Sequence, residues 1–179
     1  MAARTMLNTI LRDAAKTPLL RMTSKIDSQA LRMTAVPVKE IPMASLHKDI
    51  PIDASPDHVW AAVRDFGAVH RLAPGFVVDT KLEDGARIVT FANGNVAREL
   101  LVDCDEARRR LVYAIVSERV THYSASVQVF EDGLFEDGSA RSRMSWIVDV
   151  LPNDIAPYIS GQMDLGVLAM QKAFAGAPT

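Results

Sequence analysis

The chain of 179 residues has one cysteine, Cys104, and no long apolar run. A single cysteine excludes an internal disulfide. This fits a reducing compartment, and we therefore expect a cytoplasmic location. A membrane-spanning helix needs roughly 18 uninterrupted apolar residues, and no stretch of the sequence approaches this length. We therefore expect the body of the protein to be soluble.

The sequence also lacks the motifs of catalysis, metal binding and nucleic-acid binding. It contains no glycine-rich phosphate loop and no nucleophile elbow, and acidic neighbours disfavour the reactive thiolate form of Cys104. The net charge is −2, and the lack of a long basic run argues against nucleic acid as a partner. The histidines have no metal-ligand spacing; they are His47, His58, His70 and His122. We expect neither a metal nor another cofactor.

Positive charge is concentrated near the N-terminus. Residues 1–45 contain seven basic and three acidic side chains, so they carry a net charge of +4 against −6 for the remainder. The spacing of apolar residues between Met6 and Ala15 indicates a short amphipathic helix. We predict that residues 1–44 form a flexible or weakly helical extension. A transit peptide and a helix lying on a membrane surface are the alternatives that this composition allows.

The rest of the sequence predicts one strand, one or two short helices, six strands and a long helix. The first strand is Ser45–Ile52, and Ser55 caps a helix over residues 56–66. Residues 68–74 form a second short helix or a turn. Turn residues such as those of Glu131–Gly133 separate the later strands. These strands are Val77–Leu82, Arg87–Phe91, Ala97–Asp103, Arg109–Ser117, Thr121–Phe130 and Ala140–Leu151.

The C-terminal helix is the only large element available to cover an apolar sheet face. Asn153 or Asp154 caps it, and helical spacing predicts a buried stripe of Ile155, Ile159, Met163, Val167, Met170 and Phe174. Short connections favour an antiparallel meander. We predict an α+β fold in one domain over residues 45–176, with a curved seven-stranded antiparallel sheet around the long helix. A strongly bent sheet meets such a helix only at its middle, so we expect an enclosed cavity. Gly161 and Gly166 in the helix fit either close packing or room for a ligand.

Two segments, Ile52–Trp60 and Val63–Gly67, resemble the opening of the polyketide cyclase/dehydrase family. Further similar segments are Gly85–Arg87, Arg98–Leu100, Asp103–Glu106, Arg109–Tyr113, Tyr123–Ala125, and Trp146 before Pro152. The resemblance covers about residues 45–175. It implies a helix-grip fold of the SRPBCC superfamily, which includes the START and birch-pollen-allergen-like proteins. Members of that superfamily enclose an apolar cavity that binds lipids, sterols, polyketides or plant hormones, and some are cyclases or dehydratases.

The chain also resembles the plant abscisic-acid receptors around Arg87, Glu99 and Tyr123. It departs from them where their hormone response resides, because the turn Ala92–Asn95 is shorter than their gate loop. Ser117 or Glu118 stands where they have a latch histidine. We therefore do not expect a hormone receptor. The resemblance places His70 about where those receptors carry a carboxylate-anchoring lysine.

Strand parity and the resemblance together predict which side chains bind a ligand in the cavity. They are His70, Arg87, Val89, Phe91, Glu99, Tyr113, Tyr123, Val127, Trp146, Met163 and Val167. Buried opposite charges such as Arg87 and Glu99 either orient the polar end of a ligand or form a structural salt bridge at the rim of the sheet. The aromatic side chains favour a cavity wall over chemistry, and His70 is a candidate proton donor or acceptor at the mouth.

The leading functional prediction is a carrier or sensor that binds a small hydrophobic or amphipathic molecule. The alternative is a cyclase or dehydratase for a polyketide-like or aromatic substrate, in which His70, Glu99 or Tyr123 moves protons. A membrane-associated lipid-transfer protein, using the basic N-terminal segment, is a further alternative. The predicted partner is thus a small hydrophobic ligand, and the sequence leaves monomer and homodimer open.

Overall fold

The computed structural model describes residues 43–136, 138 and 140–175. The predicted extension, with its amphipathic helix, lies almost wholly outside these residues. The described elements follow the predicted order: β1 (Ala44–Ile52), α2 (Pro56–Arg64), a 3₁₀ turn (Phe66–Ala68), α3 (Val69–Leu72), β2 (Val77–Glu83), β3 (Ala86–Phe91), β4 (Val96–Asp105), β5 (Arg110–Ile115), β6 (His122–Leu134), β7 (Ala140–Leu151), a 3₁₀ turn (Asn153–Ile155) and α4 (Ala156–Phe174).

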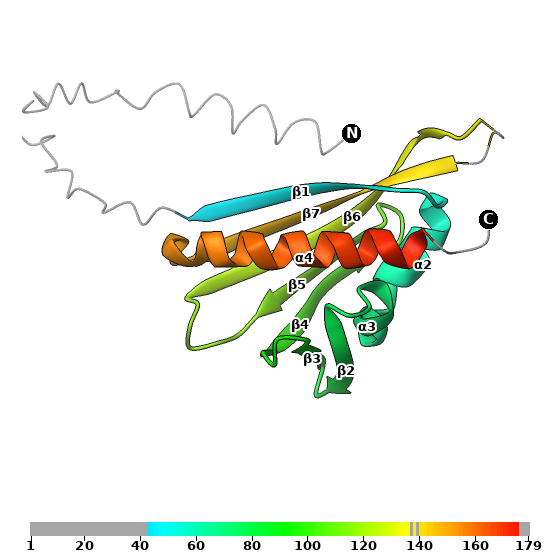
Figure 1. The fold of residues 1–179 in the computed structure, drawn as a ribbon. Coiled ribbons are helices and arrows are strands. Elements are labelled where there is room, and N and C mark those ends of the chain that lie inside the picture. Colours follow the sequence, from blue (N-terminus) through cyan, green and yellow to red (C-terminus); the bar gives the residue numbers. More distant parts are fainter. Residues whose placement is uncertain (1–42, 137, 139, 176–179) are drawn as a thin grey trace, which may run out of the picture. The chain divides into compact units, whose positions relative to one another are not determined.

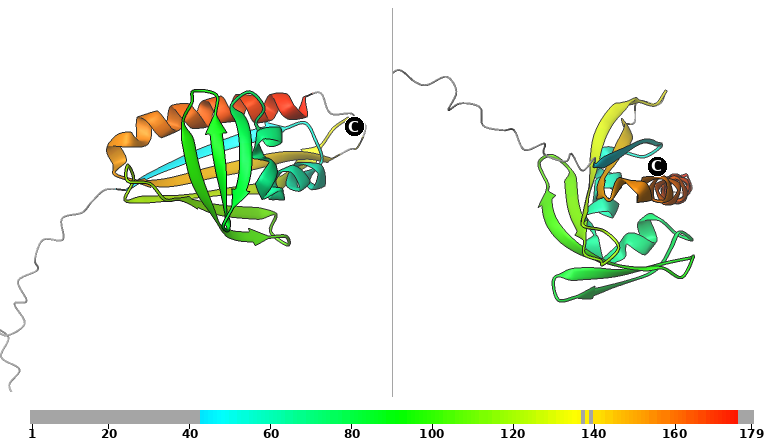
Figure 2. Two further views of the ribbon diagram at one scale, coloured as in Figure 1. Left: turned by 90° about the horizontal axis from the view of Figure 1, so that it is seen from below. Right: turned by 90° about the vertical axis from the view of Figure 1, so that its left-hand side faces the viewer.

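The seven strands form one antiparallel sheet in the order β1-β7-β6-β5-β4-β3-β2. The sheet curves around α4, which is seen end-on inside the concave face in Figure 2 and lies across the strands in Figure 1. Register shifts between Val77 and Asp79 and between Leu101 and Asp103 mark bulges in β2 and β4. Bulges bend and twist the strand that carries them, so they contribute to this curvature. The predicted fold class is confirmed.

Alternation along the strands decides which side chains face α4. On β6 the side chains of Tyr123, Ala125 and Val127 are buried, and on β7 those of Met144 and Trp146 are buried. The intervening side chains lie on the convex face, as expected for a sheet with one covered side. The concave face therefore carries the core and, as described below, the cavity.

Helix α2 begins as the sequence predicts. Ser55 is the N-cap, its hydroxyl oxygen accepts a hydrogen bond from the backbone N–H of His58 at 3.4 Å, and Pro56 occupies the first turn. Val59, Trp60 and Val63 are buried. The indole Nε1 of Trp60 donates to Glu106 Oε2 at 2.6 Å, which ties the helix to the end of β4. Trp60 thus belongs to the core at one end of the sheet.

Two local predictions were wrong. The segment Glu131–Gly133 is not the turn between β6 and β7, because β6 continues to Leu134 and the register shifts between Glu131 and Leu134. Gly133 has φ of +84°, and such a residue fits a bulge as well as a turn. The second error concerns the start of α4: Asn153 and Asp154 lie in the preceding 3₁₀ turn, and no side chain caps the helix.

The buried side of α4 is narrower than the predicted stripe. Met163, Gly166, Met170 and Phe174 are buried, whereas Ile155, Ile159 and Val167 are only partly buried. Gly166 is the point of closest approach, because a Cβ atom built on it would lie 2.9 Å from Cζ3 of Trp146. Gly161 has no atom within 4 Å of such a Cβ position. Close packing therefore explains one glycine and not the other.

A candidate ligand-binding cavity

A cavity of about 610 Å³ lies between the concave face of the sheet and helix α4. This volume falls in the range of about 300–1,000 Å³ that is typical of small-molecule sites. Apolar side chains make up most of the wall: Val63, Val69, Leu72, Ala73, Phe76, Val77, Val89, Phe91, Val96, Ala97, Leu111, Ile115, Val127, Ile159 and Met170. The polar and mixed lining residues are Arg87, Asn95, Glu99, Tyr113, Ser117, Arg119, Tyr123, Trp146, Tyr158 and Gln162, and Gly94 and Gly166 complete the wall.

Arg87 and Glu99 form a buried ion pair in the wall of this cavity. They are directly opposite each other on β3 and β4, each is no more than 5% exposed, and Arg87 Nε donates to Glu99 Oε2 at 2.6 Å. The pair therefore lies in the interior and not at the rim of the sheet. Its two charges compensate each other, which makes burial tolerable.

The Arg87 guanidinium makes further contacts with the protein. Its Nη1 donates to the backbone carbonyl of Phe66 at 3.2 Å. The ring of Phe66 lies 4.3 Å from the guanidinium carbon and that of Tyr113 lies 5.1 Å from it, both in cation–π positions. Burial raises the pKa of Glu99 above its ordinary value, while the charge of Arg87 opposes this shift. These contacts leave Arg87 Nη2 and Glu99 Oε1 without a hydrogen-bond partner among the described residues.

Three aromatic side chains add polar atoms to the interior. Burial raises the pKa of Tyr113 well above its usual value, and the nearby Tyr123 and Glu99 add to the shift. Burial, reinforced by Glu99, likewise raises the pKa of Tyr123. Both hydroxyls are therefore protonated at neutral pH. The buried Nε1 of Trp146 has no hydrogen-bond partner among the described residues. The interior thus contains three neutral polar groups that lie close enough to influence one another, beside one compensated ion pair.

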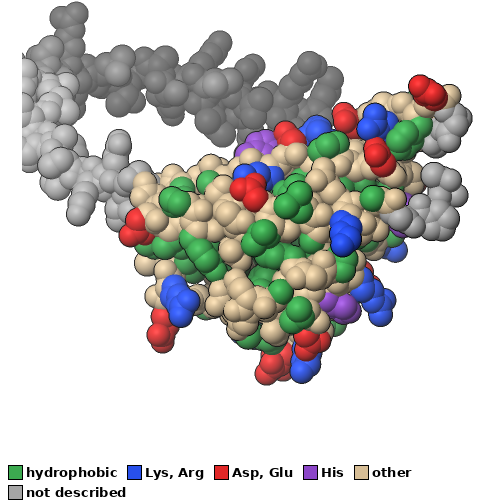
Figure 3. Space-filling view, in the orientation of Figure 1, with side chains coloured by type: hydrophobic (Ala, Val, Ile, Leu, Met, Phe, Trp, Pro, Cys, Tyr) green, Lys and Arg blue, Asp and Glu red, His purple; other side chains and the backbone are tan. Residues whose placement is uncertain are grey.

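The turn between β3 and β4 is tied to α4 at the edge of the cavity. Asn93 Nδ2 donates to Gln162 Oε1 at 3.1 Å, and Asn95 Nδ2 donates to Tyr158 Oη at 2.7 Å. Gly94, between the two asparagines, has φ of +84°, a conformation that glycine adopts at little cost. Figure 3 shows hydrophobic side chains along and below α4 on the face of the molecule where this helix lies.

Eight of the eleven predicted ligand-binding residues line the cavity: Arg87, Val89, Phe91, Glu99, Tyr113, Tyr123, Val127 and Trp146. The other three do not. Met163 is 1% exposed and packs in the core, Val167 is partly buried against the core, and His70 lies on α3 with its buried Nδ1 lacking a partner among the described residues. Their binding roles remain predictions that this geometry does not support.

Sequence reasoning missed the part of the wall that comes from α3 and from one side of α4. The α4 residues that line the cavity are Tyr158, Ile159, Gln162, Gly166 and Met170, of which the predicted stripe contained Ile159 and Met170. The predicted stripe was rotated toward Met163 and Val167 because Gln162 and Gly166 are not apolar. Asn95 and Arg119 were also missed, because polar residues in turns are usually expected to face solvent. The i, i+4 spacing of Gln162 and Gly166, which places both on one side of the helix, was the sequence pattern that could have indicated this cavity-facing side.

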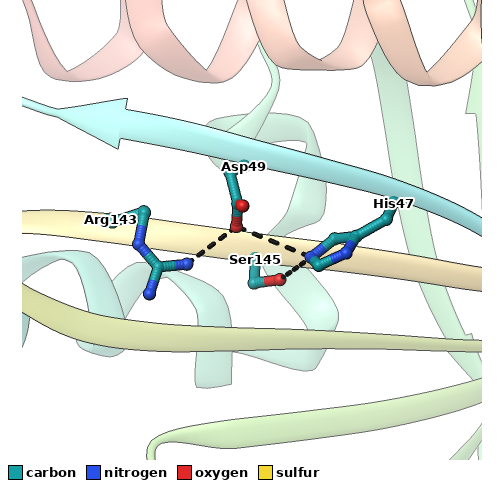
Figure 4. A network of polar contacts seen from close by, with 4 residues as sticks. All are labelled: His47, Asp49, Arg143 and Ser145. Carbon is teal, nitrogen blue, oxygen red and sulfur yellow. Dashed lines mark hydrogen bonds and ion pairs between the residues drawn. The ribbon is translucent and has the colours of Figure 1, made fainter.

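A second polar cluster lies on β1 and β7, away from the cavity, and Figure 4 shows its four side chains. His47 Nε2 lies 2.6 Å from Ser145 Oγ and 3.6 Å from Asp49 Oδ1, and Arg143 Nη1 donates to Asp49 at 2.7 Å. A catalytic triad needs the carboxylate on the histidine nitrogen that does not face the serine. Here one nitrogen faces both groups, so we assign this cluster to the packing of β1 on β7.

Other kinds of site find no support in the part of the chain that the structure describes. No group of three histidine, cysteine, aspartate or glutamate side chains there could hold a metal ion. Burial raises the pKa of the Cys104 thiol, and the carboxylates of Glu106 and Asp103 raise it further, in the predicted direction. Among the described helices, none combines the length and the apolar character needed to cross a membrane.

Solved structures with this fold include two bacterial proteins and a plant enzyme. An uncharacterised protein of Bacillus thuringiensis is 22% identical with a TM-score of 0.65, over 74% of this chain and 99% of that one. The protein XoxI of Bacillus cereus is 22% identical with a TM-score of 0.64, over 74% of this chain and 96% of that one. Norcoclaurine synthase of Thalictrum flavum is 19% identical with a TM-score of 0.58, over 76% of this chain and 96% of that one.

At such identities these likenesses establish the fold alone. No curated protein matches the chain. The family model described as polyketide cyclase / dehydrase and lipid transport matches residues 43–176, which is the whole of the sheet together with helix α4. The chain therefore belongs to the polyketide cyclase/dehydrase and lipid-transport family and has the helix-grip fold of the SRPBCC superfamily.

Proposed function

We propose that the protein is a carrier or sensor that binds one small, largely apolar molecule in the cavity between the sheet and α4. The observation that carries this proposal is the cavity of about 610 Å³, with a mostly apolar wall and a buried, charge-compensated ion pair. A wall of this kind favours apolar surface, while its few polar atoms supply orientation. Membership of the polyketide cyclase/dehydrase and lipid-transport family is consistent with binding of such a molecule.

The expected affinity is moderate. A ligand of about 20 non-hydrogen atoms that gains about 0.3 kcal/mol per atom has a binding free energy of about −6 kcal/mol. This corresponds to a Kd of roughly 40 μM. A cognate ligand that also forms a hydrogen bond with the hydroxyl of Tyr113 or Tyr123 would bind more tightly, because a satisfied donor adds to the binding free energy.

The test combines identification of bound molecules with titration of a neutral probe. Native mass spectrometry and solvent extraction of the purified protein should reveal a copurified small molecule. N-phenyl-1-naphthylamine, an uncharged dye that fluoresces in apolar sites, should bind at a ratio of one to one. A protein that carries no extractable molecule and binds no dye would refute the proposal.

Two matched substitutions show whether the dye occupies this cavity. Ala97 on β4 lines the cavity, so Ala97→Phe should fill part of it and weaken dye binding. Ile88 lies on β3 between the inward side chains of Arg87 and Val89 and does not line the cavity, so Ile88→Phe should leave dye binding unchanged. Equal effects of the two substitutions would place the dye elsewhere.

A cyclase or dehydratase activity is the second candidate, and one observation favours it. Glu99 is buried in the cavity wall with a raised pKa, next to Tyr123, and such groups are suited to moving protons. His70, the other proposed proton carrier, does not line the cavity. Glu99→Gln keeps an acceptor for Arg87 but removes the titrating group. Turnover of an identified substrate should fall at least about tenfold in this variant while dye binding persists.

A further inference from the structure

The charges in the cavity wall are distributed unevenly between the interior and the mouth. Three charged side chains line the cavity: Arg87, Glu99 and Arg119. Arg87 and Glu99 neutralise each other at 2.6 Å. Arg119 is exposed, and no carboxylate among the described residues forms an ion pair with it. The charged lining residues therefore sum to one positive charge, on Arg119. We define the mouth of the cavity by its exposed lining residues, which are Gly94, Asn95, Val96, Ser117, Arg119 and Tyr158.

The position of Arg119 is set by a short turn between β5 and β6. Its backbone N–H donates to Ser117 Oγ at 3.1 Å, and the N–H of Val120 donates to the carbonyl of Ser117 at 3.4 Å. Ser117 and Val120 also form an isolated antiparallel bridge. These bonds hold Arg119 at the tip of the turn, where its side chain contributes to the lining.

Two side chains of α4, Tyr158 at the mouth and Gln162 one turn further along the helix, have hydrogen-bond donors that are not used within the described part of the protein. Tyr158 Oη and Gln162 Oε1 each accept a hydrogen bond from the β3–β4 turn. The hydroxyl proton of Tyr158 and the amide protons of Gln162 remain available, because these bonds use only acceptor atoms. Among the residues that the structure describes, no aspartate or glutamate lines the mouth, and Glu99, the one acidic lining residue, lies in the interior. The rim is thus rich in donors and carries one positive charge.

We propose that the preferred ligand is an amphipathic monocarboxylate that binds with its apolar body inside and its carboxylate at the mouth. Arg119, Tyr158 and Gln162 contact the carboxylate, and the wall around Trp146 and Met170 holds the apolar body. A second net charge in the interior would lack a compensating partner and would be costly to desolvate. This inference deepens the proposed function and rests on it.

The first test compares an acid with an uncharged analogue of the same length. Dodecanoate and 1-dodecanol displace the neutral dye from the wild-type protein and from Arg119→Gln. The substitution should weaken dodecanoate binding about threefold to fivefold more than it weakens dodecanol binding, as expected for loss of an exposed charge pair. Raising the salt concentration should weaken only the acid.

Glu118→Gln is the matched control, since Glu118 is the exposed neighbour of Arg119 and does not line the cavity. It should not weaken binding of the acid. A ratio of acid to alcohol affinity that is the same in the wild type and in Arg119→Gln would overturn the inference while leaving the proposed function intact. Failure of both compounds to displace the dye would overturn the inference as well, and loss of dye binding itself would overturn the proposed function.

The second test measures orientation directly. Trp146 packs against Gly166, which is eight residues, or about 12 Å of helix, beyond Tyr158. In the proposed orientation a bromine on the last carbon of dodecanoate should quench Trp146 fluorescence more than a bromine on the second carbon. The other tryptophan, Trp60, does not line the cavity. Stronger quenching by the second-carbon bromine would show that the carboxylate is inside and would overturn the inference.

Discussion

Replacing Gly166 with alanine tests whether α4 and the sheet are packed as closely as the structure shows. The added Cβ atom would lie 2.9 Å from Cζ3 and 3.2 Å from Cη2 of Trp146, and 3.3 Å from Cε1 of Phe76. Both neighbours are aromatic rings that line the cavity, so they can yield only by giving up their packing on α4 and moving into the cavity. Overpacking of this kind costs about 1–3 kcal/mol.

Gly161→Ala supplies the reference for this prediction. Gly161 lies in the same helix, is exposed, and has no atom within 4 Å of its virtual Cβ position. Alanine is favoured over glycine in a helix interior by about 1 kcal/mol, and this gain is common to both substitutions. The difference in unfolding free energy between the two variants therefore isolates the packing cost.

Urea denaturation followed by circular dichroism gives the two free energies. We expect Gly161→Ala to stabilise the protein by about 1 kcal/mol. Gly166→Ala should be about 1–3 kcal/mol less stable than Gly161→Ala and should bind the dye more weakly, because a displaced Trp146 ring takes up cavity volume. If Gly166→Ala matches Gly161→Ala in stability and the wild type in dye affinity, the close approach of Trp146 to α4 is refuted.

Two further predictions concern the ion pair and the mouth. Because the folded state raises the pKa of Glu99, ionisation of Glu99 disfavours folding, and this destabilisation is relieved as pH falls through the folded-state pKa. The unfolding free energy of the wild type relative to Glu99→Gln should therefore increase as the pH is lowered from neutral through the folded-state pKa of Glu99, and a decrease would contradict the assignment. The double variant Asn93→Ala/Asn95→Ala removes both hydrogen bonds from the β3–β4 turn to α4. Stopped-flow fluorescence should then show faster dye association and dissociation with little change in Kd, whereas unchanged rates would mean that the dye enters elsewhere.

The fold could be predicted from the sequence because its determinants are local. The Ser55-Pro56 helix start and the alternation along Tyr123–Val129 each specify one element, and the sequence order of the elements leaves one long helix to cover the sheet. The bulge at Glu131–Gly133 could not be predicted, since glycine with positive φ serves a turn and a bulge equally well. What decides between them is the pairing of β6 with β7 on the far side of the bulge.

The cavity-lining residues on the strands could also be predicted from the sequence, whereas those on α4 could be predicted only in part. Strand parity predicted inward side chains such as Arg87, Glu99 and Tyr113 correctly, because a period of two leaves only two choices. A helix can be rotated about its axis by any angle, so the sequence must show which of its sides faces the cavity. In α4 the apolar stripe through Met163 indicated the side that packs in the core. The cavity-facing side contains Gln162 and Gly166, whose roles depend on the turn at Asn93 and the ring of Trp146. These are tertiary contacts that no local pattern encodes.

The two interpretations of Arg87 and Glu99, as a structural pair and as an orienting pair, are compatible once their hydrogen bonds are counted. Arg87 uses Nε for Glu99 and Nη1 for the carbonyl of Phe66, between two aromatic rings. Its Nη2 has no hydrogen-bond partner among the described residues, and Arg87 lines the cavity. Glu99 uses Oε2 for Arg87, and the described residues supply no hydrogen bond to Oε1. We infer that Glu99 Oε1 and Arg87 Nη2 are the two atoms of the pair that remain for a ligand. A hydroxyl on the apolar body can bond to either, because a hydroxyl both donates and accepts.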